Sequence, residues 1–140
     1  MYKNYYFELH FWKVTMKKSF ENEYAEYGID NGIVRFTYKQ NIAIQLAGAM
    51  EIVSDRLKLQ KGRAYPILCD IRGIIDINKD ARRFLANEGS SLTIAVAFIS
   101  DNPLSQILTD LYMLANMPPI PTKIVSNELE GLQFLSDFIE

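Results

Sequence analysis

YPILCDIRGIIDINKDARRFLANEG, residues 65–89, is the stretch that decides the fold of this 140-residue chain. Its opening letters, YPILCDI, form an apolar run that is too short for a helix and is typical of a central strand covered on both faces. We expect a polar loop over residues 72–77, followed by a helix that Asn78 caps and that ends at Gly89. Because ligands of open α/β sheets bind where strands end and helices begin, we expect the functional site along this stretch.

The rest of the chain alternates between strand and helix patterns on both sides of this stretch. Two alternating runs flank Asn31-Gly32, and this dipeptide indicates a β-hairpin because both residues tolerate a positive φ. The other expected elements are an extended piece around 42–44, a helix over 46–57, a strand over 91–100, a helix over 104–115, a strand over 122–126 and a helix over 128–139. This order predicts an α/β fold, in which a mostly parallel mixed sheet carries an N-terminal antiparallel hairpin and about four helices.

Apolar spacing predicts which faces of these elements are buried. In the second strand of the hairpin, Val34, Phe36 and Tyr38 alternate with polar side chains and are expected to face the core. In the helix over 46–57, apolar residues recur at the spacing that is typical of an amphipathic helix. The buried stripe expected there consists of Leu46, Ala49, Met50, Val53 and Leu57.

Composition and charge limit the classes of function. Hydrophobic residues make up 49% of the chain and charged residues 23%, which matches an ordinary globular domain. A formal net charge of −2 without a Lys/Arg cluster argues against a nucleic-acid partner. The single cysteine, Cys69, cannot form an internal disulfide and favours a reducing, cytoplasmic location. No apolar run approaches the roughly 20 residues of a transmembrane segment.

The domain organisation follows from the same patterns. We interpret residues 1–19 as an N-terminal aromatic extension or an extra strand, and residues 20–140 as a single α/β domain. An exposed aromatic strand near the N-terminus would offer an unpaired edge. A homodimer formed by edge pairing is therefore one interpretation of this segment.

Two segments, CDIRGIIDINKDARRF at 69–84 and PTKIVSNELEGLQFL at 121–135, carry a family resemblance together with the order of elements. The chain resembles the STAS domain of the bacterial anti-sigma-factor antagonists, and more closely the uncharacterised STAS-like proteins of bacteria, over residues 20–140. The resemblance implies a STAS-like fold and a regulatory role in protein interaction. In the antagonists, a partner kinase phosphorylates a serine at the start of the helix after the central strand, and this breaks a protein complex.

The chain departs from the STAS pattern at the phosphorylated position. Asp70-Ile71-Arg72-Gly73 matches the Asp-x-Ser-Gly-like run of the antagonists in part, but Asn78-Lys79-Asp80-Ala81 occupies the place of their Asp-Ser-Ser-Gly motif. No phosphorylatable hydroxyl remains there. Either Asp80 supplies a permanent charge that replaces the phosphate, or the position is only a favourable helix N-terminus and the switch is absent. We favour the second interpretation.

The leading hypothesis is a non-enzymatic regulatory module that docks a protein partner by shape and charge, without a cofactor or a metal. A guanidinium near a helix N-terminus suits this role because it can bind an anion or a carboxylate of the partner. The alternative for these arginines is surface ion pairing with Asp76 or Glu88. The expected partner-binding residues are Asp70, Arg72, Gly73, Asp76, Asn78, Lys79, Asp80, Arg82 and Arg83.

Two other functions stay open at this point. The first is a small carrier that holds a lipid or another apolar small molecule between the sheet and the helices. The second is an enzyme with a metal or phospho-acceptor site, because carboxylates grouped at one sheet edge suit Mg²⁺. The aspartates concerned are Asp70, Asp76, Asp80 and Asp101. For these four side chains we favour helix caps and solvated loop charges.

Overall fold

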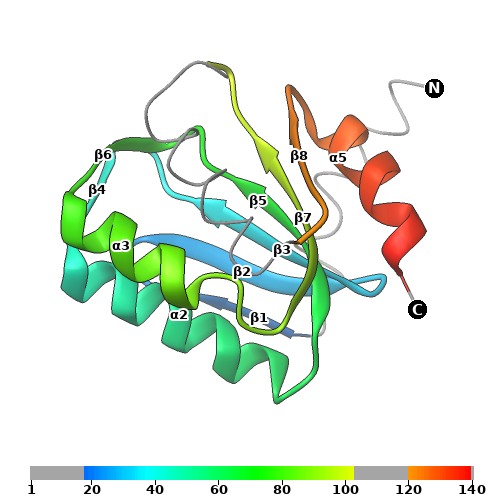
Figure 1. The fold of residues 1–140 in the computed structure, drawn as a ribbon, viewed down its shortest axis with the longest axis horizontal. Coiled ribbons are helices and arrows are strands. Elements are labelled where there is room, and N and C mark those ends of the chain that lie inside the picture. Colours follow the sequence, from blue (N-terminus) through cyan, green and yellow to red (C-terminus); the bar gives the residue numbers. More distant parts are fainter. Residues whose placement is uncertain (1–17, 103–119, 140) are drawn as a thin grey trace.

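The protein has an α/β fold in which helices cover both faces of a central sheet (Figure 1). The computed structural model describes residues 18–102 and 120–139. The sheet has six strands in the order β1-β2-β3-β5-β7-β8, and neighbours from β3 to β8 are parallel. The strands are β1 (Lys18–Glu21), β2 (Ala25–Asp30), β3 (Ile33–Tyr38), β5 (Tyr65–Asp70), β7 (Thr93–Ile99) and β8 (Thr122–Val125). The prediction of a mostly parallel mixed sheet is confirmed.

The N-terminal hairpin consists of β2 and β3, as the sequence predicts. The two strands pair antiparallel along their whole length. Asn31 and Gly32 form the turn, and their φ angles of 51° and 79° lie in the left-handed region. A turn of this kind follows the right-handed twist of the two strands. β1 pairs antiparallel with the other side of β2 and forms one edge of the sheet.

A second, two-stranded sheet joins β4 (Ile42–Ile44) and β6 (Ile74–Ile77) in parallel. The extended piece around 42–44 is confirmed, but the polar loop expected over 72–77 is wrong over residues 74–77. Residues 74–77 form a strand because β4 supplies their backbone partners and because Ile77 is buried in the core with Ile44. The loop between β5 and β6 is therefore short.

Helices lie on both sides of the central sheet. α2 (Leu46–Gln60) and α3 (Lys79–Glu88) pack together on one face, and α5 (Glu128–Leu135) and the short 3-10 helix η1 (Ser136–Phe138) lie on the other (Figure 1). The described part of the chain has three α-helices rather than about four, and the helix expected over 104–115 lies outside the described residues. None of the three has the length and hydropathy that a membrane-spanning helix needs.

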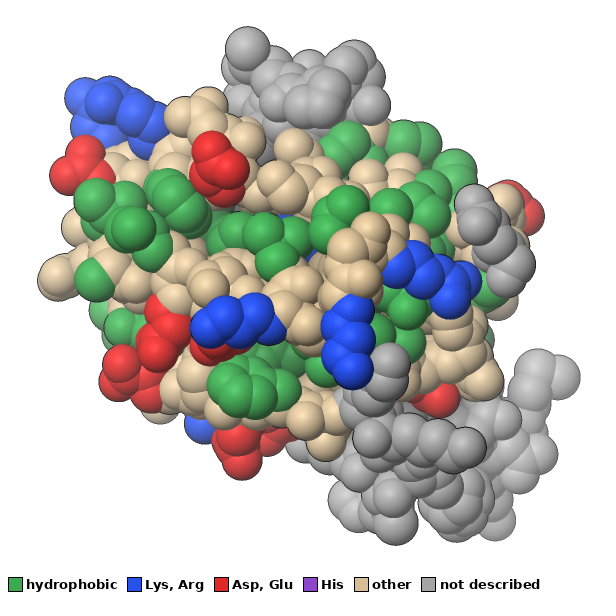
Figure 2. Space-filling model, turned by 90° about the horizontal axis from the view of Figure 1, so that it is seen from below, with side chains coloured by type: hydrophobic (Ala, Val, Ile, Leu, Met, Phe, Trp, Pro, Cys, Tyr) green, Lys and Arg blue, Asp and Glu red, His purple; other side chains and the backbone are tan. Residues whose placement is uncertain are grey.

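α2 buries a different stripe from the one expected. Leu46 and Met50 are 39% and 50% exposed, so their expected place in the core is wrong. The expected and the observed stripes share Ala49 and Val53. The observed buried face also contains two polar side chains, those of Arg56 and Gln60. The buried residues of α2 are Gly48, Ala49, Ile52, Val53, Arg56 and Gln60. On the side of the molecule where α2 lies, apolar side chains form separate patches among charged ones (Figure 2).

Two apolar clusters fill the two sides of the central sheet. The larger cluster lies beneath α2 and α3 and includes Val34, Phe36 and Tyr38, as the alternation in β3 predicts. There the Phe36 ring packs edge-on against the rings of Tyr27 and Tyr38, an arrangement that aromatic pairs favour. The smaller cluster lies beneath α5 and includes Ile33. β3 is therefore buried on both faces.

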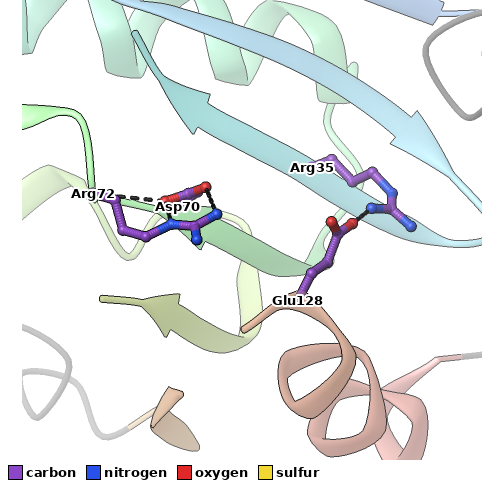
Figure 3. A network of polar contacts seen from close by, with 4 residues as sticks. All are labelled: Arg35, Asp70, Arg72 and Glu128. Atoms are coloured by element: carbon purple, nitrogen blue, oxygen red, sulfur yellow. Dashed lines mark hydrogen bonds and ion pairs between the residues drawn. The ribbon is translucent and has the colours of Figure 1, made fainter. Parts of the chain in front are cut away.

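An ion pair between Arg35 and Glu128 joins β3 to α5 (Figure 3). Only 11% of the Arg35 side chain and 18% of the Glu128 side chain are exposed. The carboxylate of Asp30 lies 3.5 Å from Nε of Arg35 and adds a second negative charge. Removing one partner of a buried pair leaves the other charge uncompensated, so the pair matters more for stability than an exposed one would.

Replacing Glu128 by Gln should lower the free energy of unfolding by about 2 kcal/mol, because the buried Arg35 guanidinium loses its main counter-charge while Asp30 remains. Glu88→Gln changes the same charge at an exposed position of α3 and should alter stability by less than about 0.5 kcal/mol. Chemical denaturation measures both values. Equal effects of the two substitutions would show that this ion pair does not stabilise the packing of α5.

Candidate functional site

The candidate site is the segment that leads from the end of β5 through β6 into α3, called here the docking segment (residues 70–83). Because β3, β5 and β7 run parallel, their carboxyl ends lie at the same edge of the sheet. Open α/β sheets place their binding sites at this edge. Three features determine the path of the docking segment. They are a turn held by Asp70, a close backbone approach at Gly73 and a helix cap at Asn78.

The turn at the end of β5 is held by Asp70 and Arg72 (Figure 3). The Asp70 carboxylate accepts hydrogen bonds from the backbone N–H of Arg72 at 3.0 Å, from its Nε at 2.9 Å and from its Nη2 at 2.7 Å. The Asp70 side chain is 16% exposed and the Arg72 side chain 42%. Ion pairing of Arg72 with Asp76 or Glu88 was one alternative from the sequence, and the structure shows Asp70 as an ion-pair partner instead.

Gly73 is a buried residue of the docking segment and does not contribute to its exposed surface. A Cβ atom at this position would lie 2.1 Å from the carbonyl oxygen of Lys39, in the chain that links β3 to β4. The Gly73 carbonyl oxygen also accepts a hydrogen bond of 3.0 Å from the backbone N–H of Ile42. The absence of a side chain therefore lets two backbone segments touch, and this contact positions the loop.

The start of α3 is capped as the sequence predicts. Oδ1 of Asn78 accepts a hydrogen bond of 2.9 Å from the backbone N–H of Ala81. Asp80 lies in the first turn, where the helix dipole favours a negative charge. Arg82 is half-buried and its Nη1 donates to the carbonyl oxygen of Ile77 at 2.6 Å, so this arginine supports the junction between β6 and α3.

The exposed part of the docking segment carries charges of both signs. Besides Arg72, the exposed polar side chains of the segment are Asp76, Asn78, Lys79, Asp80 and Arg83. Among the described residues, no group of His, Cys, Asp or Glu is arranged to hold a metal ion. The four aspartates from the sequence analysis therefore do not come together as a metal site.

A cavity of about 90 Å³ lies between the central sheet and the helices α2 and α3, where the carrier alternative would hold its ligand, but sequence reasoning did not identify the residues that line it. Most of its lining is apolar and comes from the strands and from both helices, with Ile67, Leu85 and Phe98 among the lining residues. Its polar lining includes the side chains of Arg56 and Tyr38. The cavity is therefore a second candidate site. It is mostly apolar, and none of its lining residues belongs to the charged docking segment.

Arg56 is buried in the wall of this cavity with 4% of its surface exposed. Its Nη1 donates to Oε1 of Gln60 and, at 3.1 Å, to the carbonyl oxygen of Ser91. Its Nη2 donates to the carbonyl oxygen of Gly89 at 3.2 Å. Gln60 in turn donates to the carbonyl oxygens of Arg63 and Leu92. This network joins α2 to the chain between α3 and β7.

Burial shifts the pKa values of the groups in this cavity. Desolvation lowers the pKa of Arg56, and it raises the pKa of Tyr38 well above its ordinary value. Desolvation also raises the pKa of the Cys69 thiol, with the nearby Asp70 charge as a smaller cause. Cys69 therefore stays a protonated, buried side chain, as expected for a cysteine in a central strand.

One signal in the sequence could have located Arg56. The spacing of Ala49, Ile52, Val53 and Arg56 is itself helical, and it places a charged side chain on an otherwise apolar face. A charge in that position is uncommon, since arginine is seldom fully buried without a partner. The stripe expected from the sequence, through Leu46 and Met50, contains no charge and has the same helical spacing.

Comparison with known proteins identifies a family from the sequence and a related fold from the structure. The sequence matches the family described as "Domain of unknown function (DUF7793)" over residues 27–139. The structure is similar to that of an uncharacterized protein of the DUF3478 family, with a SpoIIAA-like fold, from Shewanella loihica PV-4. The identity is 15% and the TM-score 0.62, with 84% of this chain and 98% of that chain covered. No curated protein matches the chain. The STAS-like fold that the sequence resemblance implies is confirmed.

Replacing Gly73 by Ala should lower the free energy of unfolding by about 3 kcal/mol, because the new Cβ would overlap the backbone of Lys39. Gly62→Ala is the matched comparison: its φ of 79° is left-handed, but a Cβ there meets no atom within 4 Å. That substitution should cost about 1 kcal/mol, from conformational strain alone. Thermal or chemical denaturation gives both values. A loss at Gly73 no larger than that at Gly62 would contradict the close approach.

Proposed function

The chain belongs to the domain family DUF7793, and from this premise we propose that it is a protein-interaction module that binds its partner through the docking segment. The observation that carries the proposal is the contrast between a fixed backbone and an exposed, charged surface. Gly73 and the Asn78 cap position the backbone. Lys79 and Arg83, one helical turn apart, extend from it into solvent.

The proposed mechanism is recognition by shape and charge rather than catalysis. Asp76, Lys79, Asp80 and Arg83 alternate in sign over a short distance along the chain, so a partner would need a matching arrangement of charges. Complementary charges increase the association rate and disfavour partners with the wrong pattern. A site built on a strand and a helix presents these charges with less loss of conformational entropy than a mobile loop would.

Regulation in this proposal does not use phosphorylation of the docking segment. The segment contains no serine, threonine or tyrosine between residues 70 and 83. Asp80 contributes a constant negative charge at the start of α3, which also stabilises the helix. We place the protein in the cytoplasm, because its single cysteine is a buried thiol and needs no oxidising compartment.

The variant that tests the proposal should reverse charges without disturbing the backbone. Arg72 and Arg82 are poor choices, because the first holds the turn with Asp70 and the second bonds the carbonyl oxygen of Ile77. Lys79 and Arg83 are exposed and lie on the same side of α3. The double substitution Lys79→Glu and Arg83→Glu is therefore the sharper test.

This double substitution should weaken partner binding by at least about tenfold, because it reverses the positive charges that face the partner. The control is Lys58→Glu with Lys61→Glu, which changes the net charge equally at the end of α2, beside the start of β5. Affinity capture from the source cells with quantitative mass spectrometry compares the two variants with the natural protein. A partner retained by the control and lost by the test variant supports the proposal, whereas equal recovery by both contradicts it.

A small carrier is the second candidate function, and the cavity between the sheet and the helices favours it. At about 90 Å³ the cavity is smaller than the roughly 300 Å³ or more of typical small-molecule sites, which disfavours a long lipid chain. Native mass spectrometry of protein purified from its own cells separates the two functions. A retained mass of lipid size would favour the carrier, and bare polypeptide would favour the interaction module.

A further inference from the structure

The cavity beneath α2 and α3 contains hydrogen-bond donors that the described residues do not satisfy. Nη1 of Arg56 uses both of its hydrogens on Gln60 and Ser91, and Nη2 uses one on Gly89. The Nε–H and the second Nη2–H therefore have no acceptor within residues 18–102 and 120–139. Only 4% of Arg56 is exposed, so these two hydrogens have little contact with bulk water.

Tyr38 adds a third donor to the same cavity. Its side chain lines the cavity, and only 6% of the residue is exposed. Its hydroxyl makes no hydrogen bond within the part of the chain that the structure describes. A buried hydroxyl without a partner is unfavourable in an apolar environment. The cavity therefore offers several donors without matching acceptors, which is the pattern of a site for an acceptor-only group.

The positive charge of Arg56 also favours an acceptor-only group, and in particular an anion. No carboxylate among the described residues pairs with Arg56, and its hydrogen-bond acceptors are a side-chain amide and two backbone carbonyls. Gly89 is the C-cap of α3, so the helix dipole offers roughly half an elementary negative charge nearby. Within the described residues no full negative charge compensates the rest of the Arg56 charge, and a buried ion in that state is strongly unfavourable. Water would satisfy the donors but would leave this charge in place.

The remaining walls limit the size and the polarity of the occupant. They include Ile52, Val53, Ile67 and Phe98, which are apolar and buried. An apolar cavity of roughly 150 Å³ accepts a benzene molecule, so a cavity of about 90 Å³ suits a ligand smaller than benzene. A carboxylate with a short hydrocarbon tail of about one to three carbons fits both the donors and the apolar walls.

We propose that this cavity binds a small aliphatic monocarboxylate, with its carboxylate on Arg56 and the Tyr38 hydroxyl and its tail against the apolar walls. The assignment goes beyond the docking segment and does not depend on it, because no residue of that segment lines the cavity. It also differs from a lipid carrier in the length of the ligand.

The test is a titration of the natural protein with sodium propionate at constant ionic strength. It is followed by the NMR signals of the Arg56 Nε–H and of the backbone amide of Ser90, which also lines the cavity. We expect saturable shifts with propionate and no saturable shifts with sodium chloride. Propionamide has the same shape without the charge, and it should bind at least about tenfold more weakly. Affinity should not keep rising along the series of acids from butyrate to decanoate, because the cavity is short.

Two substitutions and one control test whether propionate binds in this cavity. Tyr38→Phe removes only the hydroxyl and should weaken propionate binding by about fivefold, whereas Tyr65→Phe, at a buried tyrosine outside the cavity lining, should leave it unchanged. Arg56→Gln should weaken binding by at least about tenfold. Since Arg56 also holds the network of α2, its variant needs a check of folding, and the Tyr38 variant and propionamide test the proposal independently of it.

Each contrary result would overturn the assignment. These results are the absence of a saturable shift with propionate, equal binding of propionamide, or unchanged binding in Tyr38→Phe. An affinity that rises steadily up to decanoate would instead assign the cavity to a long-chain ligand. The binding of a protein partner through Lys79 and Arg83 is measured separately, so its failure would be distinguishable from a failure here.

Discussion

The pairing of β5 with β3 on one side and with β7 on the other is the interaction on which the rest of the structure depends. It places the strand at the centre of the sheet, where both of its faces are buried beneath helices. Parallel pairing also brings the carboxyl ends of these strands to one edge. The docking segment begins at that edge because Asp70 is the last residue of β5.

The two faces of the sheet are stabilised in different ways. On the α5 side, the small apolar cluster is supplemented by the ion pair between Arg35 and Glu128, which spans β3 and the first turn of the helix. On the side of α2 and α3, a larger apolar cluster surrounds a cavity, and the buried Arg56 in its wall donates to a side-chain amide and to backbone carbonyls. A paired charge therefore stabilises one face, whereas on the other face no carboxylate within residues 18–102 and 120–139 pairs with Arg56.

The elements and the candidate site differ in how far they can be predicted. The hairpin turn at Asn31-Gly32 and the cap at Asn78 depend on residues adjacent in the chain, and both were predicted correctly. The strand at β6 was missed, because its partner β4 lies about thirty residues earlier and shows only as a short apolar piece. The stripe of α2 was misplaced for a related reason. A choice between two overlapping helical faces is made by the sheet that the helix covers, not by the helix itself.

The sequence by itself determined the N-terminal hairpin, the mostly parallel central sheet and the charges of the docking segment, because apolar periodicity and capping act over a few residues. Only the tertiary structure decided that Gly73 would touch Lys39, and that Arg56 would share a cavity with Tyr38. Those contacts join residues from separate elements. Their chemistry depends on distance and burial in the packed protein, and neither quantity is encoded in the local spacing of residues.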